Sequence, residues 1–214
     1  TNILFGIDQP SDIQTLIQAI EPKNNAIIKI WVDDRGGTQP KLTQSLYTEL
    51  ITQANQAGIK VVAHQQDSDD TERLVRAGAA GFLHGRFEDE ISEALSNSLA
   101  ESNVFVIPNL GLSLLRHLSI AEDPLLRETL PAVTLSRLGT RDFAKNGDSI
   151  PVSNLNDRVR GELDQLISNL DSSIRSNFLH AISRGVPIVL GTDAGALPDH
   201  FFGYTGHKEL EIFV

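Results

Sequence analysis

Cysteine and methionine are both absent from the 214 residues. Without cysteine the chain can form no disulfide and offers no thiolate to a metal ion. Any bound metal must therefore be held by histidine, by carboxylates or by a modified side chain. The lack of disulfides does not indicate a compartment, because disulfide-free proteins occur in all of them.

Clusters of basic residues and long apolar runs are also missing. No lysine and arginine cluster is longer than a pair, and the formal net charge is −10 with a pI near 5.0. A nucleic-acid partner, which would require a basic face, is therefore not expected. No apolar run approaches the ~20 residues that cross a bilayer, and no secretion signal opens the chain. We expect a soluble protein without a membrane partner, and its localisation stays unknown.

Apolar, β-type runs alternate with helix-type periodic segments along the chain. Hydrophobic residues make up 40% of the sequence, enough for one sizeable core and one domain over residues 1–214. Strands are predicted at 26–32, 59–64, 80–84, 104–107 and 186–190. Helices are predicted at 12–20, 42–57, 68–78 and 89–102, with a long one ending at 184. Such alternation predicts an α/β fold with a parallel sheet.

The arrangement of the sheet has two candidate forms, a doubly wound open sheet and a (β/α)8 barrel. No strand is followed by a GxGxxG motif, so a dinucleotide-binding sheet has no support. The spacing of the strands fits barrel units. About fifty residues, 108–156, break this rhythm with only short apolar stretches at 112–118 and 124–138. We predict a helical and loop insertion there, since an excursion this long is usually an active-site lid or a disordered insert.

Four polar residues stand where a buried parallel strand should be apolar or has just ended: Lys29, His64, His84 and Asp193. Taken singly, each has an ordinary explanation, as a snorkelling lysine, a turn histidine or a capping aspartate. Taken together, they mark the carboxyl ends of four strands, where parallel barrels place their catalytic residues. We therefore predict that they share one site.

The motifs around these residues resemble the amidohydrolase superfamily, most closely its imidazolonepropionase- and prolidase-like branch. The motifs are Ile-Lys-Ile-Trp-Val-Asp-Asp, Val-Val-Ala-His, Phe-Leu-His-Gly and Gly-Thr-Asp-Ala-Gly, in that order. The resemblance implies strands four to eight of a TIM-type barrel, with the insertion after strand seven. It implies metal ligation by Lys29, His64, His84 and Asp193, with Asp193 as the catalytic residue. In that family the lysine is often carboxylated by CO2 and bridges two metal ions.

The resemblance also implies a reaction. A Zn²⁺ or another divalent ion, dinuclear in the complete enzyme, would activate water for hydrolysis of an amide, cyclic amide or ester bond. Asp193 would accept the proton of that water and pass it to the leaving group. The family's first metal pair, His-x-His on strand one, does not occur in this sequence.

Six further residues are candidates for binding a small-molecule or peptide-like substrate, because they follow predicted strands: Asp33, Asp34, Arg35, Asn109, His200 and His207. Each could equally be an ordinary loop residue.

Two other functions are compatible with the sequence. Lys29 could be the nucleophile of a Schiff-base lyase, although His64, His84 and Asp193 would then be unexplained. The chain could also be a non-catalytic piece that needs a partner, since five strands are fewer than a barrel of about 250 residues contains. The first residue is not methionine, and the last residues, Phe213 and Val214, fall within an amphipathic pattern. A five-stranded piece of a barrel would leave unpaired strand edges at both ends. For this reason we expect association into a homo-oligomer, or completion by an N-terminal segment outside this sequence.

Overall fold

The structure is a computed structural model that describes residues 4–20, 27–84, 90–111, 123–138, 157–195 and 201–214. The chain divides into two compact units. The first contains Thr1–Asn109 and Ile174–Gly191, and the second contains Leu110–Ser173 and Thr192–Val214. The boundary after Asn109 falls at the start of the predicted insertion.

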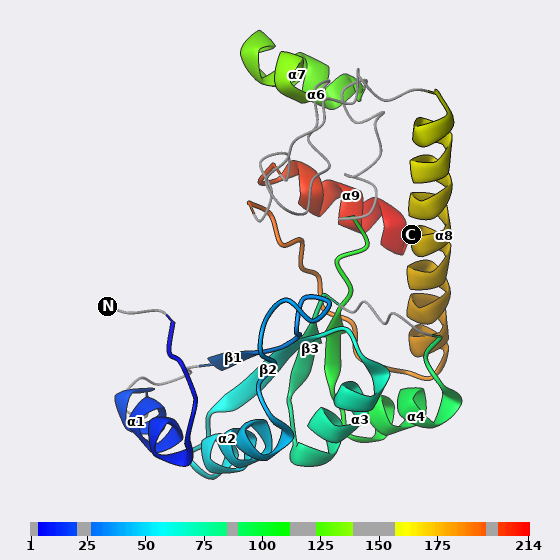
Figure 1. The fold of residues 1–214 in the computed structure, drawn as a ribbon. Helices are drawn as coiled ribbons and strands as arrows, with labels where there is room; N and C mark the ends of the chain where they lie inside the picture. Colours follow the sequence, from blue (N-terminus) through cyan, green and yellow to red (C-terminus); the bar gives the residue numbers. More distant parts are fainter. Residues whose placement is uncertain (1–3, 21–26, 85–89, 112–122, 139–156, 196–200) are drawn as a thin grey trace. The chain divides into compact units, whose positions relative to one another are not determined.

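A parallel sheet organises the first unit (Figure 1). Its four strands are β1 (Ile27–Val32), β2 (Lys60–Gln65), β3 (Gly81–Leu83) and β4 (Phe105–Ile107), hydrogen-bonded in the order β1-β2-β3-β4. Every neighbouring pair is parallel, with Trp31 opposite His64 and His64 opposite Leu83. The predicted α/β class and parallel sheet are confirmed. The described strands form an open sheet and do not close into a barrel.

The predicted strand at 186–190 is reduced to a single parallel bridge between Val106 and Ile188. The Val106 amide donates to the Pro187 carbonyl at 2.9 Å, and the Val189 amide donates to the Val106 carbonyl at 3.0 Å. The next bond of this ladder would need an N–H at residue 187, and proline has none. The prediction was therefore too long, because Pro187 prevents the ladder from extending.

Four helices alternate with the strands: α1 (Pro10–Ile20), α2 (Gln44–Gln56), α3 (Ser68–Ala77) and α4 (Glu93–Glu101). Local signals set their ends. The Asp67 carboxylate accepts the amides of Asp69 and Asp70 at the start of α3, and Gly78 ends α3 with a left-handed φ of 94°. Ser92 caps α4 in the same way. Each such cap stabilises a helix by about 1 kcal/mol.

The two faces of β1 differ in burial. One face of β1 and β2 (Ile28, Ile30, Val32, Val61 and Ala63) belongs to the core cluster that includes Leu50, Ile51 and Leu74 of α2 and α3. The other face of β1 carries Ile27, Lys29 and Trp31, and Ile27 is 62% exposed while Trp31 is 42% exposed. The alternation of a strand therefore sorts core residues from accessible ones, and Lys29 lies on the accessible face.

In the second unit, the predicted helical stretch at 124–138 is divided into α6 (Pro124–Thr129) and α7 (Ala132–Leu138). Pro131 causes the break, because a residue before proline avoids the helical region and Leu130 is extended, with ψ at 143°. The predicted helix at 112–118 lies outside the described residues.

A small cluster and a buried carboxylate hold the second unit together. Leu126 of α6 packs with Tyr204 of α9 (Tyr204–Phe213), and the Tyr204 hydroxyl donates to Asp123 at 2.9 Å. Glu209 of α9 is 1% exposed and accepts the amides of Leu110 and Gly111. Burial raises the pKa of Glu209, and these two amides oppose the rise.

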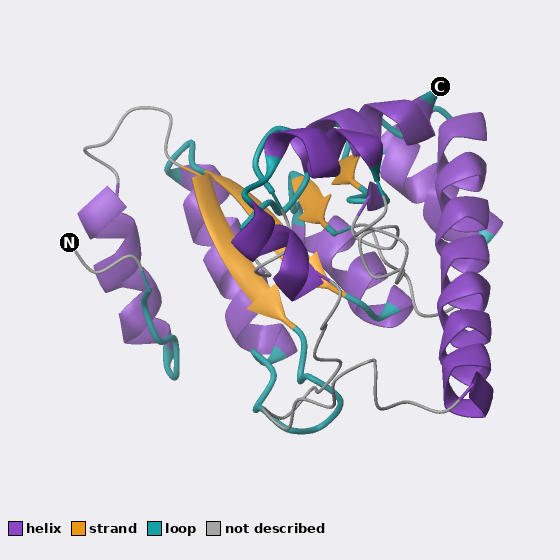
Figure 2. Cartoon of the chain, turned by 90° about the horizontal axis from the view of Figure 1, so that it is seen from above, coloured by secondary structure: helices purple, strands orange, loops and turns teal. Residues whose placement is uncertain are grey.

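The long predicted helix ending at 184 is α8 (Asp157–Ser183), which is labelled in Figure 1 and drawn among the purple helices of Figure 2. Its residues up to Ser173 belong to the second unit and those from Ile174 to the first. None of the described helices combines the length and the apolar character needed to cross a membrane.

Candidate metal centre

The carboxyl ends of the strands bring together residues that are far apart in sequence. Asp33 directly follows β1, and His64 lies near the end of β2. His84 directly follows β3, and Asn109 is the second residue after β4. Because the strands are parallel and neighbouring, their carboxyl ends meet at one edge of the sheet. Lys29, His64 and His84, which the sequence predicted to share a site, all belong to this first unit.

His64 is held between an aromatic ring and a carboxylate. Its ring stacks on Trp31 at 4.2 Å between centroids, and its Nε2 lies 2.9 Å from Asp33 Oδ2. The residue is 8% exposed. Burial lowers the pKa of His64, partly opposed by Asp33, so the neutral ring is favoured at neutral pH. Burial alone would raise the pKa of Asp33, but hydrogen bonds from the Arg35 amide and His64 hold it below its usual value.

These two charge states fix the proton on the ring. An ionised carboxylate only accepts hydrogen bonds, so Nε2 of His64 must carry the hydrogen that Asp33 binds. In a neutral ring, Nδ1 then has the free lone pair. Nδ1 is buried and has no hydrogen-bond partner among the described residues. A buried acceptor without a partner is costly, and a ligand at that nitrogen would remove the cost.

The contacts of His84 favour the other tautomer, with the proton on Nδ1. Both its backbone amide and its Nδ1 lie 3.1 Å from Oδ1 of Asn109, which is 6% exposed. A backbone amide can only donate, which identifies the Asn109 atom as the carbonyl oxygen, and that oxygen must then accept from Nδ1. In the neutral His84 ring, Nε2 is therefore the lone-pair nitrogen. His84 and Asn109 both adopt left-handed φ values, 67° and 51°.

The two imidazoles face each other at short range. Their ring centroids are 4.9 Å apart, with an interplanar angle of 64°. Each has one nitrogen held by an oxygen acceptor, which is the usual arrangement around histidines that bind metals. His64 would ligate through Nδ1 and His84 through Nε2. The described residues contain no group of three or more His, Cys, Asp or Glu suited to a metal, so these histidines would supply two ligands and other groups the rest.

Lys29 and Arg35 place positive charge beside the histidines. Lys29 Nζ lies 5.7 Å from the centroid of Trp31, and the Arg35 guanidinium carbon lies 4.5 Å from it. Both cations contribute to lowering the pKa of His64. Asp34, in the same loop, accepts the Gly36 amide at 2.9 Å and so shapes the turn.

Two of the predicted site residues belong to the second unit. Asp193 is an exposed residue of the second unit, with a left-handed φ of 50°, and the neighbouring Thr192 hydroxyl accepts the Ala194 amide. His207 is exposed on α9 in the same unit. His200 falls outside the described residues. The roles predicted for these three stay predictions.

Sequence reasoning missed the part that Trp31 has in the site. Its position was noted only as part of a strand, although the two-residue period places it on the same face as Lys29. It also did not foresee that Asp33 and Asn109 are hydrogen-bonded to histidines, and the substrate-binding role predicted for both stays a prediction. Hydrogen-bond partners of this kind depend on strand register, which the sequence does not display.

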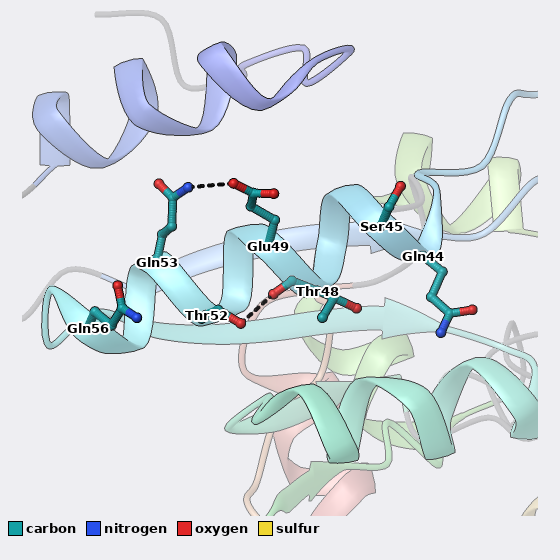
Figure 3. A pocket seen from close by; sticks show the side chains of 7 residues that line it. All are labelled: Gln44, Ser45, Thr48, Glu49, Thr52, Gln53 and Gln56. Atoms are coloured by element: carbon teal, nitrogen blue, oxygen red, sulfur yellow. Dashed lines mark hydrogen bonds between the residues drawn. The ribbon is translucent and has the colours of Figure 1, made fainter.

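A surface groove on the first unit lies apart from these residues. It runs along the outer side of α2, and Figure 3 shows the seven side chains that line it: Gln44, Ser45, Thr48, Glu49, Thr52, Gln53 and Gln56. Glu49 is hydrogen-bonded to Gln53 at 2.9 Å. The groove contains no histidine, and we assign no chemistry to it.

Solved structures of hydrolases share this fold. A Xaa-Pro dipeptidase with methionine in its active site aligns with 97% of the chain at a TM-score of 0.59 and 17% identity. A putative prolidase from Bifidobacterium longum aligns with 98% of it at 0.60 and 19% identity. An amidohydrolase aligns with 96% at 0.57 and 16% identity. The likeness is one of fold.

The chain spans 44%, 45% and 41% of the lengths of these three proteins. No protein-family model and no curated protein matches the sequence.

Proposed function

We propose that this protein is a metal-dependent hydrolase of amide, cyclic amide or ester bonds. The observation that carries the proposal is the pair of imidazoles whose centroids are 4.9 Å apart, together with the buried Nδ1 of His64, which has no partner among the described residues. Imidazole is a ligand that suits Zn²⁺ and similar divalent ions. The shared fold with a dipeptidase, a prolidase and an amidohydrolase supports the same class of reaction.

The residues that are hydrogen-bonded to the two histidines fit this assignment. Asp33 and Asn109 favour complementary tautomers of the two rings, in which a neutral ring has its lone pair on Nδ1 of His64 and on Nε2 of His84. When bound, a divalent ion would lower the pKa of a water molecule and polarise the substrate carbonyl. Asp193 would accept the proton and deliver it to the leaving group.

Lys29 is proposed as a third ligand, in the form of a carbamate. It precedes Trp31 by two residues in β1 and so lies on the same face of the sheet, and Trp31 is paired with His64. A free ammonium cannot bind a metal, but carboxylation would replace its positive charge with an oxygen donor. Such a group could join two ions in a dinuclear centre.

We further propose that the site is completed by other parts of the protein or by a second copy. Ile27 of β1 is 62% exposed. Val189, which follows the bridge residue Ile188 beside β4, is 42% exposed. Apolar groups on the inner side of a barrel would be covered by the remaining strands. Light scattering after size-exclusion chromatography would detect association, and a stable monomer with full activity would contradict this part of the proposal.

Metal content tests the site directly. The protein, loaded with Zn²⁺ and then dialysed, should retain metal, and His64→Ala and His84→Ala should each lose most of it. Asp33→Ala and Asn109→Ala should weaken affinity by about 10- to 100-fold, as expected for partners of ligating histidines. His180→Ala is the matched control, since His180 also has a buried Nε2 with no described partner but no second histidine against it. Equal metal content in all variants would contradict the assignment.

A separate variant tests the proton transfer. Asp193→Asn keeps the shape of the side chain but removes the base, so turnover should fall about 10²-fold or more while metal content is unchanged. Turnover equal to that of the unmodified protein would place the base elsewhere.

A further inference from the structure

Arg35 carries a charge that none of the described carboxylates neutralises directly. No carboxylate oxygen of the described residues lies within 4.0 Å of its guanidinium. The adjacent acids are engaged in other bonds: Asp33 accepts the Arg35 amide at 2.8 Å and contacts His64, while Asp34 accepts the Gly36 amide. As far as the described residues show, the fork of N–H donors of the guanidinium has no carboxylate bound to it.

The loop fixes where this guanidinium lies. Arg35 has a left-handed φ of 55°, which is uncommon for a residue with a side chain, and Gly36 follows at 69°. The guanidinium carbon sits 4.5 Å from the Trp31 centroid, and Trp31 in turn stacks on His64. Trp31 therefore contacts both the Arg35 guanidinium and the ring of His64, the proposed metal ligand.

Two further contacts hold the same loop, one to helix α3 and one within the loop itself. Lys41 Nζ lies 2.5 Å from Asp70 Oδ2 on α3, and Asp70 is 5% exposed. The amide of Gln39 donates to the Asp34 carbonyl at 2.9 Å, which closes the turn. Arg35 is therefore carried by a loop that is tied at several points, as a recognition residue requires.

We propose that Arg35 binds a carboxylate of the substrate, one residue beyond the bond to be cleaved. This inference rests on the proposed hydrolase function and names its substrate class: amides whose leaving amine is an amino acid with a free carboxylate, such as N-acyl amino acids and dipeptides. A guanidinium binds a carboxylate through two parallel N–H···O bonds. Arg35 and His64 are each within 4.5 Å of the Trp31 ring, which places the carboxylate-binding group one side chain away from the proposed metal ligand.

Trp31 provides a readout that does not depend on catalysis, because it is the single tryptophan of the sequence and lies under the guanidinium. Its fluorescence would be followed during titration with N-acetyl-alanine, N-acetyl-proline and N-acetyl-phenylalanine, each beside its primary amide, with and without added Zn²⁺. At least one acid should bind at least 10-fold more tightly than its amide. Arg35→Met should lose this preference, and Arg35→Lys should retain part of it.

Arg76→Met is the control, because Arg76 is an exposed arginine on α3 paired with Glu72. It should bind the acids as the unmodified protein does. Equal binding of acid and amide, undiminished acid binding by Arg35→Met, or binding of none of the acids would overturn the assignment of Arg35.

Hydrolysis assays separate this inference from the proposed function. If the acids bind through Arg35 but no amide is hydrolysed, carboxylate recognition stands and the hydrolase proposal fails. If amides are hydrolysed and Arg35→Met slows the free acids and their primary amides equally, the hydrolase proposal stands and carboxylate recognition fails.

Discussion

The two faces of the parallel sheet are formed by the same strands but carry different kinds of side chain. The face that belongs to the core presents Ile28, Ile30, Val61, Ala63 and Phe82, all nearly inaccessible to solvent. The other face presents Lys29, Trp31 and His64. Since successive side chains of a strand alternate between faces, one short sequence can serve packing and chemistry at once. The comparison implies that substitutions on the first face should affect stability and those on the second should affect binding.

The largest expected effect comes from a matched pair of truncations. Phe82→Ala should lower the free energy of unfolding by about 3–5 kcal/mol, because Phe82 is fully buried and its loss leaves a cavity. Trp31→Ala removes a larger side chain that is 42% exposed, so the loss should be smaller, while metal binding at His64 should weaken. Urea denaturation of both variants would measure the difference. Equal losses of stability would contradict the division between the faces.

A smaller effect is expected where the loop after β1 is tied to the core. Lys41→Met should destabilise the protein by about 1–2 kcal/mol, between the values for exposed and buried ion pairs, because Asp70 would stay buried with only its weaker contacts to Tyr47 and Arg73. The same variant should loosen the loop that carries Arg35. Carboxylate binding followed by Trp31 fluorescence would then weaken, while Glu49→Gln in the distant α2 groove should leave it unchanged.

The smallest effect concerns pH. Burial lowers the pKa of His64 in the folded state below 6.5, so the unfolded chain binds a proton first as the pH falls. Stability should therefore decrease as the pH falls through about 6.5 towards the folded value, by at most about 1.4 kcal/mol per pH unit. His64→Asn should flatten this part of the profile. Denaturation midpoints measured between pH 7.5 and 5 would show it, and an identical slope in both proteins would mean that His64 is not held neutral.

Much of the fold could be predicted because its signals are local. Apolar runs placed β1, β2, β3 and β4 to within one or two residues, and Gly78 marked the end of α3. The strand near 188 was overestimated, since its apolar residues do not reveal that Pro187 interrupts the ladder. The division into two compact units was not predicted either, because it depends on contacts between distant segments.

The candidate site was predicted in part for the same reason. His64 and His84 could be identified from their positions at strand ends, and the structure places their rings in contact. The tautomers set by Asp33 and Asn109 could not be predicted from the sequence. They depend on the register of neighbouring strands and on the left-handed backbone at His84 and Asn109. Asp193 remains a prediction from its motif.

The central claim is that His64 and His84 bind one metal ion through different ring nitrogens, His64 through Nδ1 and His84 through Nε2. Long-range ¹H–¹⁵N NMR of the imidazole groups observes this directly. Before metal is added, we predict that the proton is on Nε2 of His64 and on Nδ1 of His84. Addition of Zn²⁺ should then shift Nδ1 of His64 and Nε2 of His84, while His180 and His207 stay unchanged. The same tautomer in both rings, or no shift of either nitrogen with Zn²⁺, would contradict the account.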